Sequence, residues 1–296
     1  MNTAPKIFIV ILNWNGGQVL LPCLRSVFSL TYTNFEVVVV DNASADGSFE
    51  SARSHFSRAH FIRNEKNVGF AAGMNIGMKF ALSRGARYVW ILNNDTLCGR
   101  DSLSELVSAI RKEQNNAILS PLILTPLGKT WFSFGKIDFF RMKAFHSAPP
   151  VDTKESNPYE SEYLSGCAMF FPKRVLQKIG FFDEKYFLYY EDADISMRAK
   201  NAKIKLLIVP KAVIVHGEQS QAAQKKVYFL VLSGLRFFDL HAPRLLRPWM
   251  KLYILLRKVK NRMDRSSRND ETALLVHKAY ADYASGKKAD ILSHPH

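Results

Sequence analysis

The chain has 296 residues, of which 47% are hydrophobic and 23% are charged, so it can bury a sizeable core and is too apolar to be disordered. No apolar run reaches the roughly 18 residues of a membrane-spanning helix, and the start of the chain lacks a signal-peptide pattern. The formal net charge is +15, and nine Lys or Arg against one Asp fall within residues 244–268. The three cysteines, Cys23, Cys98 and Cys167, show no metal-like spacing and predict reduced thiols in a cytoplasmic protein.

The first half of the chain alternates strand and helix patterns. Short apolar runs typical of strands buried on both faces occupy residues 7–12, 37–40 and 88–92, and a weaker strand is predicted near residues 61–62. Helical patterns lie between them, including one over residues 70–84. This alternation predicts an open, mostly parallel α/β sheet flanked by helices, in which ligands bind at the carboxyl ends of the strands.

The second half of the chain has a less regular pattern. Its aromatic and β-branched residues 117–145 predict mixed strands or a hairpin. The further elements predicted for it are a strand over residues 163–171, helices over 172–179 and 191–199, and two strands over 205–209 and 212–215. From about Val227 the pattern becomes helical and increasingly basic.

Two carboxylates, Asp41 and Asp95, directly follow apolar strands at the edge where ligands are expected. Each could simply cap the helix that follows it. Each could instead accept hydrogen bonds from a nucleotide, or hold Mg²⁺ or Mn²⁺ together with a substrate diphosphate. The sequence contains no G-x-G-x-x-G after the first strand and no G-x-x-x-x-G-K, which argues against a dinucleotide site or a phosphate loop.

Three glycines, Gly69, Gly73 and Gly77, recur every four residues and share one face of the predicted helix. Each interior glycine costs about 0.5–1 kcal/mol relative to alanine, so some group must approach the backbone closely on that face. That group is either a neighbouring strand, or a ligand at the helix N-terminus with Asn67 and Asn75 as polar contacts.

Three carboxylates, Glu191, Asp192 and Asp194, open a predicted helix directly after an aromatic run. Acidic residues in a first turn stabilise a helix through its dipole. A carboxylate held against aromatic side chains also has a raised pKa, which suits a general base. His216 ends an apolar strand, where it is either a structural histidine or a metal ligand.

Taken in order, these residues resemble glycosyltransferase family 2, an inverting family with the GT-A fold. The matching segments are residues 12–15, 40–48, 67–77, 92–96, 165–169 and 190–194, followed by His216. They are most similar to the rhamnosyltransferase-like branch that builds bacterial surface polysaccharides. The resemblance implies a catalytic domain over residues 1–240, with a nucleotide-donor half over 1–97 and an acceptor half over 98–240, and a basic amphipathic helical tail over 241–296.

The resemblance also implies a role for each matching residue. Asp192 would be the base that deprotonates the acceptor hydroxyl. Asp95 would bind Mg²⁺ or Mn²⁺, with His216 as a second ligand or a diphosphate contact. Asp41 would bind the nucleobase of the donor. The donor contacts as a whole would come from Trp14, Asp41, Asn67, Gly69, Gly73, Asn75 and Asn93. Acceptor contacts would come from Gly166, Cys167 and Glu191.

The resemblance implies a dTDP- or UDP-linked sugar donor and a glycan or lipid-linked acceptor. The chain departs from the family pattern at Asn93, which replaces the first acid of the D-x-D element, and at Leu232-Ser233, where an Arg-Asn pair is missing. A nucleotidyltransferase that makes nucleotide sugars is a rival interpretation, but residues 13–17 lack the Arg and Lys of its phosphate loop. A nucleic-acid-binding protein is another, but much of the positive charge lies in the tail.

The tail predicts an amphipathic helix that starts near Arg247. Its apolar stripe comprises Leu245, Trp249, Leu252, Leu256, Val259 and Met263. This stripe could pack on the catalytic domain or on a second copy of the chain in a homodimer. Together with the dense cations, it also has the pattern of a helix lying on an anionic membrane surface, where each Lys or Arg contributes about 1 kcal/mol. We expect a cytoplasmic enzyme attached peripherally to the inner face of the cell membrane.

Overall fold

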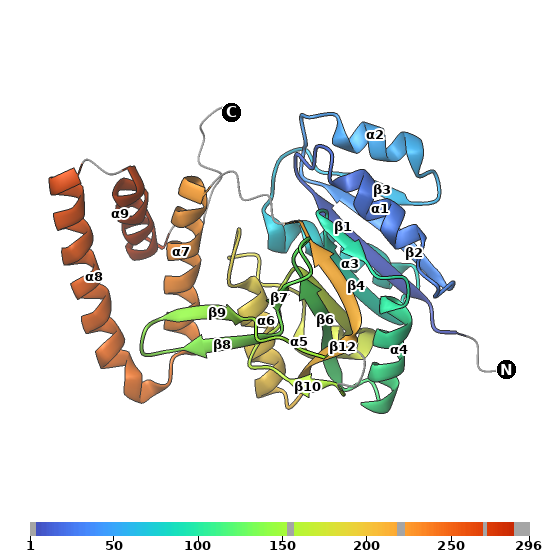
Figure 1. The fold of residues 1–296 in the computed structure, drawn as a ribbon. Coiled ribbons are helices and arrows are strands. Elements are labelled where there is room, and N and C mark those ends of the chain that lie inside the picture. Colours follow the sequence, from blue (N-terminus) through green and yellow to red (C-terminus); the bar gives the residue numbers. More distant parts are fainter. Residues whose placement is uncertain (1–3, 153–156, 218–222, 269–270, 287–296) are drawn as a thin grey trace.

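A large mixed sheet forms the centre of the protein, as the computed structural model in Figure 1 shows for residues 4–152, 157–217, 223–268 and 271–286. The strands are β1 (Ile7–Asn13), β2 (Phe35–Asp41), β3 (His60–Arg63), β4 (Tyr88–Asn93), β5 (Thr96–Cys98), β6 (Ala117–Leu124), β7 (Thr130–Phe132), β8 (Phe134–Asp138), β9 (Lys143–Ser147), β10 (Tyr159–Glu160), β11 (Ala168–Pro172) and β12 (Lys205–His216). The helices are α1 (Leu20–Phe28), α2 (Ser48–His55), α3 (Phe70–Ser83), α4 (Ser102–Lys112), α5 (Lys173–Ile179), α6 (Glu191–Asn201), α7 (Ala223–His241), α8 (Arg247–Arg268) and α9 (Glu271–Ala284), with a short 3₁₀ turn at Arg244–Leu246.

The N-terminal half of the sheet is parallel, as predicted. Strand β1 pairs in parallel with β2 and β4, and β2 pairs in parallel with β3. Every residue of β1 is buried because the sheet is covered on both faces, which explains the apolar run from Ile7 to Leu12. Helix α3 packs on β1, β2 and β4. The mostly parallel α/β fold expected from the alternating pattern is therefore confirmed.

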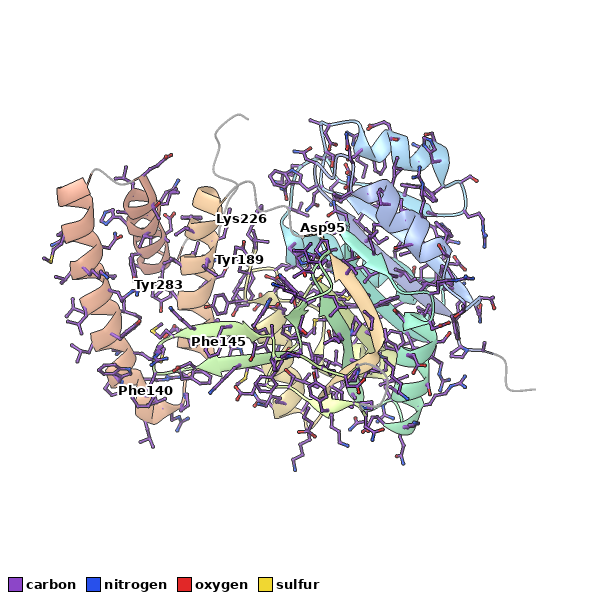
Figure 2. All side chains as sticks on the ribbon, viewed as in Figure 1. Asp95, Phe140, Phe145, Tyr189, Lys226 and Tyr283 are labelled. Carbon is purple, nitrogen blue, oxygen red and sulfur yellow. The ribbon has the colours of Figure 1, made fainter. Side chains whose placement is uncertain are left out.

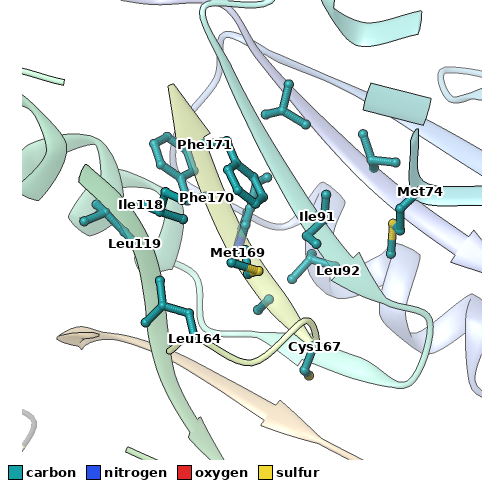
Figure 3. Close-up of a cluster of buried hydrophobic side chains, with 14 of the residues drawn as sticks. Met74, Ile91, Leu92, Ile118, Leu119, Leu164, Cys167, Met169, Phe170 and Phe171 are labelled. Atoms are coloured by element: carbon teal, nitrogen blue, oxygen red, sulfur yellow. The ribbon is translucent and has the colours of Figure 1, made fainter. Parts of the chain in front are cut away.

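The C-terminal half of the sheet is mixed. Strand β11 runs antiparallel between β4 and β6, and β12 returns in parallel to β6, giving the order β10-β12-β6-β11-β4-β1-β2-β3. Figure 3 shows the core at this junction, where Phe170 and Phe171 of β11 pack with side chains of β4 and β6. A single hydrophobic core thus runs from the parallel half of the sheet into the mixed half.

Two strand predictions were wrong in detail. The strand predicted over residues 163–171 starts only at Ala168, and the residues before it form a loop. The two strands predicted over 205–209 and 212–215 are one strand, β12, whose register shifts between Val209 and Val213. Pro210 lies within this irregularity, and its missing N–H removes a ladder hydrogen bond there.

The C-terminal helices form a separate small layer beside the sheet domain (Figure 1). Helix α7 packs against α9 through a second apolar cluster that includes Tyr228, Phe229, Leu232 and Ala279. Helix α8 starts at Arg247, as predicted, and turns its apolar stripe outward. Among the described residues, no helix has the length and apolar character needed to cross a bilayer. The domain boundaries at residues 97 and 240 stay a prediction.

A substitution at Gly77 tests the close packing of the glycine face of α3 against the sheet. A Cβ atom on Gly77 would overlap Cγ1 of Val10 and lie 3.0 Å from Cγ2 of Val40. Gly77→Ala should lower the free energy of unfolding by about 1–3 kcal/mol, because overpacking outweighs the better helix propensity of alanine. Urea denaturation measures this. Lys79→Ala, on the exposed face of the same helix, removes an exposed ion pair with Glu184 and should change the free energy of unfolding by less than about 0.5 kcal/mol. Equal effects of the two substitutions would contradict the packing argument.

Candidate active site

The register of the parallel strands brings polar residues together at their carboxyl ends. Asn13 at the end of β1 lies beside Asp41 at the end of β2, and Asn93 ends β4 beside Leu12. The amide nitrogen of Asn13 donates to Oδ1 of Asp41 at 2.8 Å and to the hydroxyl of Ser44 at 3.1 Å. Its amide oxygen accepts from Asn94 at 2.9 Å. This network fixes the loops that follow three strands at the expected ligand edge.

Asp41 is fully enclosed by this network. Its Oδ2 accepts a backbone hydrogen bond from Ser44 at 2.9 Å, the Nε atom of Arg63 lies 3.6 Å away, and the side chain is 0% exposed. A contact between Asp41 and a nucleotide base therefore needs the loop at Ser44 to move. Trp14, in contrast, is exposed in the loop after β1. The donor roles predicted for Asp41 and Trp14 stay predictions.

The glycine-rich segment mostly packs against the protein itself. A Cβ atom on Gly73 would lie 2.5 Å from Cδ1 of Leu12. Gly69 has φ +87°, and a Cβ there would lie 2.5 Å from the carbonyl oxygen of Phe187. Asn67 stabilises the same loop, since its Oδ1 accepts from the backbone N–H of Gly69 at 2.9 Å. Close helix–strand and loop packing thus accounts for the glycines without a ligand.

The structure corrects the prediction for Asn75. Its amide nitrogen donates to the carbonyl oxygen of Phe182 at 2.9 Å, and its amide oxygen accepts from the backbone N–H of the same residue at 3.1 Å. The side chain is 2% exposed. Asn75 therefore anchors α3 to the 181–184 loop and has no free polar atom for a sugar donor.

The remaining predicted residues line one cavity of about 480 Å³. Strand β4, strand β12, the 165–167 loop and the start of α6 each contribute to it. The predicted residues in its lining are Asn93, Asp95, Gly166, Cys167, Glu191, Asp192 and His216. Three of its lining residues, Asp95, Tyr189 and Lys226, are labelled in Figure 2 between the sheet and the start of α7.

Asp95 and His216 meet across this cavity. Antiparallel pairing of β5 with β12 sets Thr96 beside His216, and the backbone N–H of Gly217 donates to the carbonyl oxygen of Asp95 at 2.8 Å. As a result, Oδ1 of Asp95 lies 3.2 Å from Nε2 of His216. Oδ1 of Asp95 and Nδ1 of His216 are buried and make no hydrogen bond. Buried polar atoms that make no hydrogen bond are rare, and here they leave room for an additional ligand between the carboxylate and the imidazole.

This pair fits a divalent cation held jointly with a substrate. A carboxylate oxygen is a hard ligand suited to Mg²⁺ or Mn²⁺, and such ions are commonly bound by one or two carboxylates plus substrate phosphates. The described residues contain no group of three or more His, Cys, Asp or Glu that could hold a metal alone. Asn93 beside the pair supplies a neutral group where a second acid would stand. A cation at this position therefore depends on a diphosphate and water for its remaining ligands.

Two neighbouring carboxyl groups, the buried Glu191 and the partly buried Asp192, line the same cavity. Burial raises the pKa of Asp192, although its carboxylate accepts backbone hydrogen bonds from Gly166 at 2.9 Å and Ala193 at 2.7 Å. Burial and the neighbouring charge of Asp192 raise the pKa of Glu191 well above its usual range. Oε2 of Glu191 is buried without a hydrogen bond. One negative charge is therefore best shared by the pair, with Asp192 as the ionised member because it accepts two N–H groups.

The turn before this pair has unusual backbone geometry. Tyr189 and Tyr190 both have φ 68°, in the left-handed region that non-glycine residues rarely adopt. Each such residue costs of order 1–3 kcal/mol and persists where surrounding contacts enforce it. Here the ring of Tyr190 packs on Phe237 and Phe238 of α7, with centroids 5.3 Å and 5.8 Å away. The C-terminal helices thus hold the turn that positions Glu191 and Asp192.

Three further cavity residues were missed from the sequence. The ring of Trp131 lies between His146 and His216, with centroid distances of 4.6 Å and 4.5 Å. Lys226 adds an ammonium group from the first turns of α7. Trp131 and His146 lie on short strands of an irregular region, and only the ring contacts of Trp131 with His146 and with His216 mark them. Lys226 had a weak signal, since it is a basic residue shortly after the His216 strand.

Residues 8–180, more than half of the chain, match the family described as glycosyl transferase family 2. The chain belongs to this family. The match covers the parallel half of the sheet, the Asp95 turn, and β11 with the loop before it. The resemblance found in the sequence is confirmed. Together with the carboxylates of the cavity, it favours a glycosyltransferase over a nucleotidyltransferase or a nucleic-acid-binding protein.

Known relatives agree with a rhamnosyltransferase-like branch. A low-salt glycan biosynthesis hexosyltransferase of Haloferax volcanii is 27% identical over 67% of this chain and 62% of its own length. An N-acetylglucosaminyl-diphospho-decaprenol L-rhamnosyltransferase of Mycobacterium tuberculosis is 24% identical over 70% of this chain and 75% of its own. The chain thus spans less than two thirds of the first of these proteins.

A solved structure shares the GT-A architecture. GalNAc-T7, crystallised with UDP, GalNAc and Mn²⁺, superposes with a TM-score of 0.63 at 19% identity, over 79% of this chain and 48% of that protein. At this identity the likeness shows the fold alone. The GT-A fold with a helical C-terminal region is therefore confirmed.

The raised pKa of Glu191 predicts that replacing this residue by glutamine stabilises the protein by an amount that depends on pH. The carboxyl group of Glu191 holds its proton more tightly in the folded chain than in the unfolded chain. Its contribution to the free energy of unfolding is therefore lost as the pH rises through the folded pKa. Glu191→Gln should therefore raise Tm by at least about 2 °C at pH 8, and the gain should shrink towards pH 4. Thermal unfolding across this range measures it. Glu65→Gln, at an exposed site, should follow the wild type; a gain independent of pH would contradict this argument.

Proposed function

We propose that this glycosyltransferase transfers a sugar, rhamnose or a similar hexose, from a nucleotide diphosphate carrier to a hydroxyl of a glycan or lipid-linked acceptor, with inversion at the anomeric carbon. The observation that carries the proposal is one cavity lined by two chemically distinct pairs of residues. Asp95 and His216 form one pair, Glu191 and Asp192 form the other, and all four line the same space. The first pair suits a diphosphate, and the second suits an acceptor hydroxyl.

The geometry supports a direct displacement. Asp192, oriented by the N–H of Gly166, accepts the proton of the acceptor hydroxyl as that oxygen attacks the anomeric carbon. The diphosphate leaves from the opposite face, towards Asp95, His216 and Lys226. A bound Mg²⁺ or Mn²⁺ would neutralise charge on the leaving diphosphate. A single base is sufficient because no covalent intermediate forms.

The donor and the acceptor are inferred from the relatives. The mycobacterial relative is named for transfer of rhamnose to a sugar on a decaprenol diphosphate. GalNAc-T7 was crystallised with UDP and Mn²⁺. We therefore favour a dTDP- or UDP-linked donor and an acceptor on a lipid diphosphate in surface polysaccharide synthesis.

Two substitutions separate binding from chemistry. Asp95→Ala should abolish Mn²⁺-dependent binding of UDP or dTDP measured by calorimetry, because it removes the carboxylate ligand. Asp192→Asn keeps the shape of the cavity, so donor affinity should stay within a few-fold while turnover falls by about 10² or more. Unchanged nucleotide affinity in the first variant would exclude the metal site, and near-normal transfer in the second would place the base elsewhere.

We further propose that α8 attaches the enzyme to an anionic membrane surface. The apolar stripe predicted for this helix is exposed from Leu252 to Met263, while Trp249 near its start contacts Phe140 of the β8–β9 hairpin. Residues 244–268 carry a formal charge of +8, nine cations minus one Asp. The stripe residues follow each other at alternating intervals of four and three, which also suits a paired helix. A second copy would bring two strongly cationic helices together, whereas anionic lipid neutralises them.

Point substitutions test this attachment without disturbing the packing of α7 on α9. The wild type should sediment with phosphatidylglycerol-containing liposomes at low salt and less at high salt. Leu252→Asp combined with Leu256→Asp should leave the protein in the supernatant, since both side chains are exposed on α8. Leu127→Asp, at an exposed turn outside α8, should behave as the wild type. Equal sedimentation of the wild type, the double variant and Leu127→Asp would contradict the membrane attachment. Self-association of the wild type without lipid, abolished by the double substitution, would favour an oligomer contact.

A further inference from the structure

A second cavity lies between the β8–β9 hairpin and the C-terminal helices. It has a volume of about 230 Å³. Leu230, Leu235 and Phe238 of α7, Ile254 of α8 and Ala144 of β9 give it a mainly apolar lining. Figure 1 shows how the hairpin extends from the sheet domain across to α7 and α8. We call this space the hairpin cavity.

The hairpin cavity and the catalytic cavity share a wall. Tyr189 lines the catalytic cavity, and Tyr190, the next residue, lines the hairpin cavity. A Cβ atom on Gly234 of α7 would lie 3.1 Å from Cε2 of Tyr190, so a glycine there gives the ring its room. The strained tyrosine turn therefore separates the two spaces by the thickness of one chain segment, two residues before Asp192.

The charges at the hairpin cavity are of one sign. Of the lining side chains that the structure describes, Arg141, Lys143 and Arg257 are cationic and none is acidic. Arg257 lies over the ring of Tyr253, 5.9 Å from its centroid. An apolar interior with a cationic lining matches a molecule that joins a hydrocarbon chain to an anionic group. It also disfavours a second copy of this net positive chain as the occupant.

We propose that the hairpin cavity binds the hydrocarbon chain of a phosphorylated isoprenoid, the carrier of the acceptor sugar. This proposal rests on the lipid-linked acceptor of the proposed function. The cavity is smaller than the 300–1,000 Å³ typical of whole ligand sites, so it takes only the part of the chain nearest the phosphate. The rest of the chain continues into the bilayer on which α8 lies. The sugar on the same carrier reaches Asp192 past Tyr189.

Two tryptophan substitutions on one helix test this site. Leu230 and Leu240 of α7 are 47% and 53% exposed, so a larger side chain is compatible with folding at both, but only Leu230 lines the cavity. Calorimetry with farnesyl phosphate, below its micelle concentration, should show binding to the wild type and none with inorganic phosphate. Leu230→Trp should weaken farnesyl phosphate binding by about tenfold or more, and Leu240→Trp should leave it unchanged. Ile254→Trp, from the opposite wall, should repeat the loss.

Each outcome separates this site from the donor site. Mn²⁺-dependent binding of UDP or dTDP should be equal in the wild type and in all three tryptophan variants. Equal farnesyl phosphate affinity in Leu230→Trp and Leu240→Trp, or no binding to the wild type, would overturn the hairpin-cavity proposal. If the wild type showed no Mn²⁺-dependent binding of UDP or dTDP, the proposed function would be overturned instead. The farnesyl phosphate measurement would still test the hairpin cavity.

Discussion

The short antiparallel pairing of β5 with β12 is the constraint on which the active site depends. It joins a turn near residue 95 to a strand end near residue 216 through backbone hydrogen bonds, independently of the side chains. With the backbones fixed, Asp95 and His216 meet with unsatisfied atoms, a state that the surrounding sheet is rigid enough to maintain. The cost of leaving these atoms without partners is offset by the packing of the strands on either side.

The carboxyl pair in the same cavity is also positioned by the backbone around it. Burial raises the pKa of both Glu191 and Asp192, and the turn at Tyr189 and Tyr190, with its left-handed backbone, leads directly into them. Asp194, two residues after Asp192 in the first turn of α6, anchors the helix: although burial alone raises its pKa, hydrogen bonds from His241 and Arg198 lower it. The acid that holds the helix thus has side-chain partners of its own, whereas Oε2 of Glu191 in the cavity has no hydrogen bond.

Much of the fold could be predicted because the parallel strands are buried on both faces and read as apolar runs. The strand over 168–172 was extended too far because the Gly166-Cys167 loop before it is as apolar as the strand. The site was harder. Asp95 and His216 were paired by family resemblance, since no local pattern links two residues that far apart. Asn75 looked like a ligand contact because a buried amide and an exposed amide are identical in sequence, and Trp131 had no signal at all.

The β8–β9 hairpin is a two-stranded ribbon, which has little stability by itself. At its tip the carbonyl of Phe140 accepts from the indole of Trp249 in α8 at 2.9 Å, and at its base His146 packs on Trp131, which packs on His216. The tip of the hairpin is thus held by α8, and its base is held by the ring of Trp131 beside His216. In evolutionary terms, substitutions in α8 and substitutions around His216 are therefore not independent, because one ribbon contacts both. A substitution in α8 that removes the Trp249 contact also withdraws support from the strand whose base packs on Trp131.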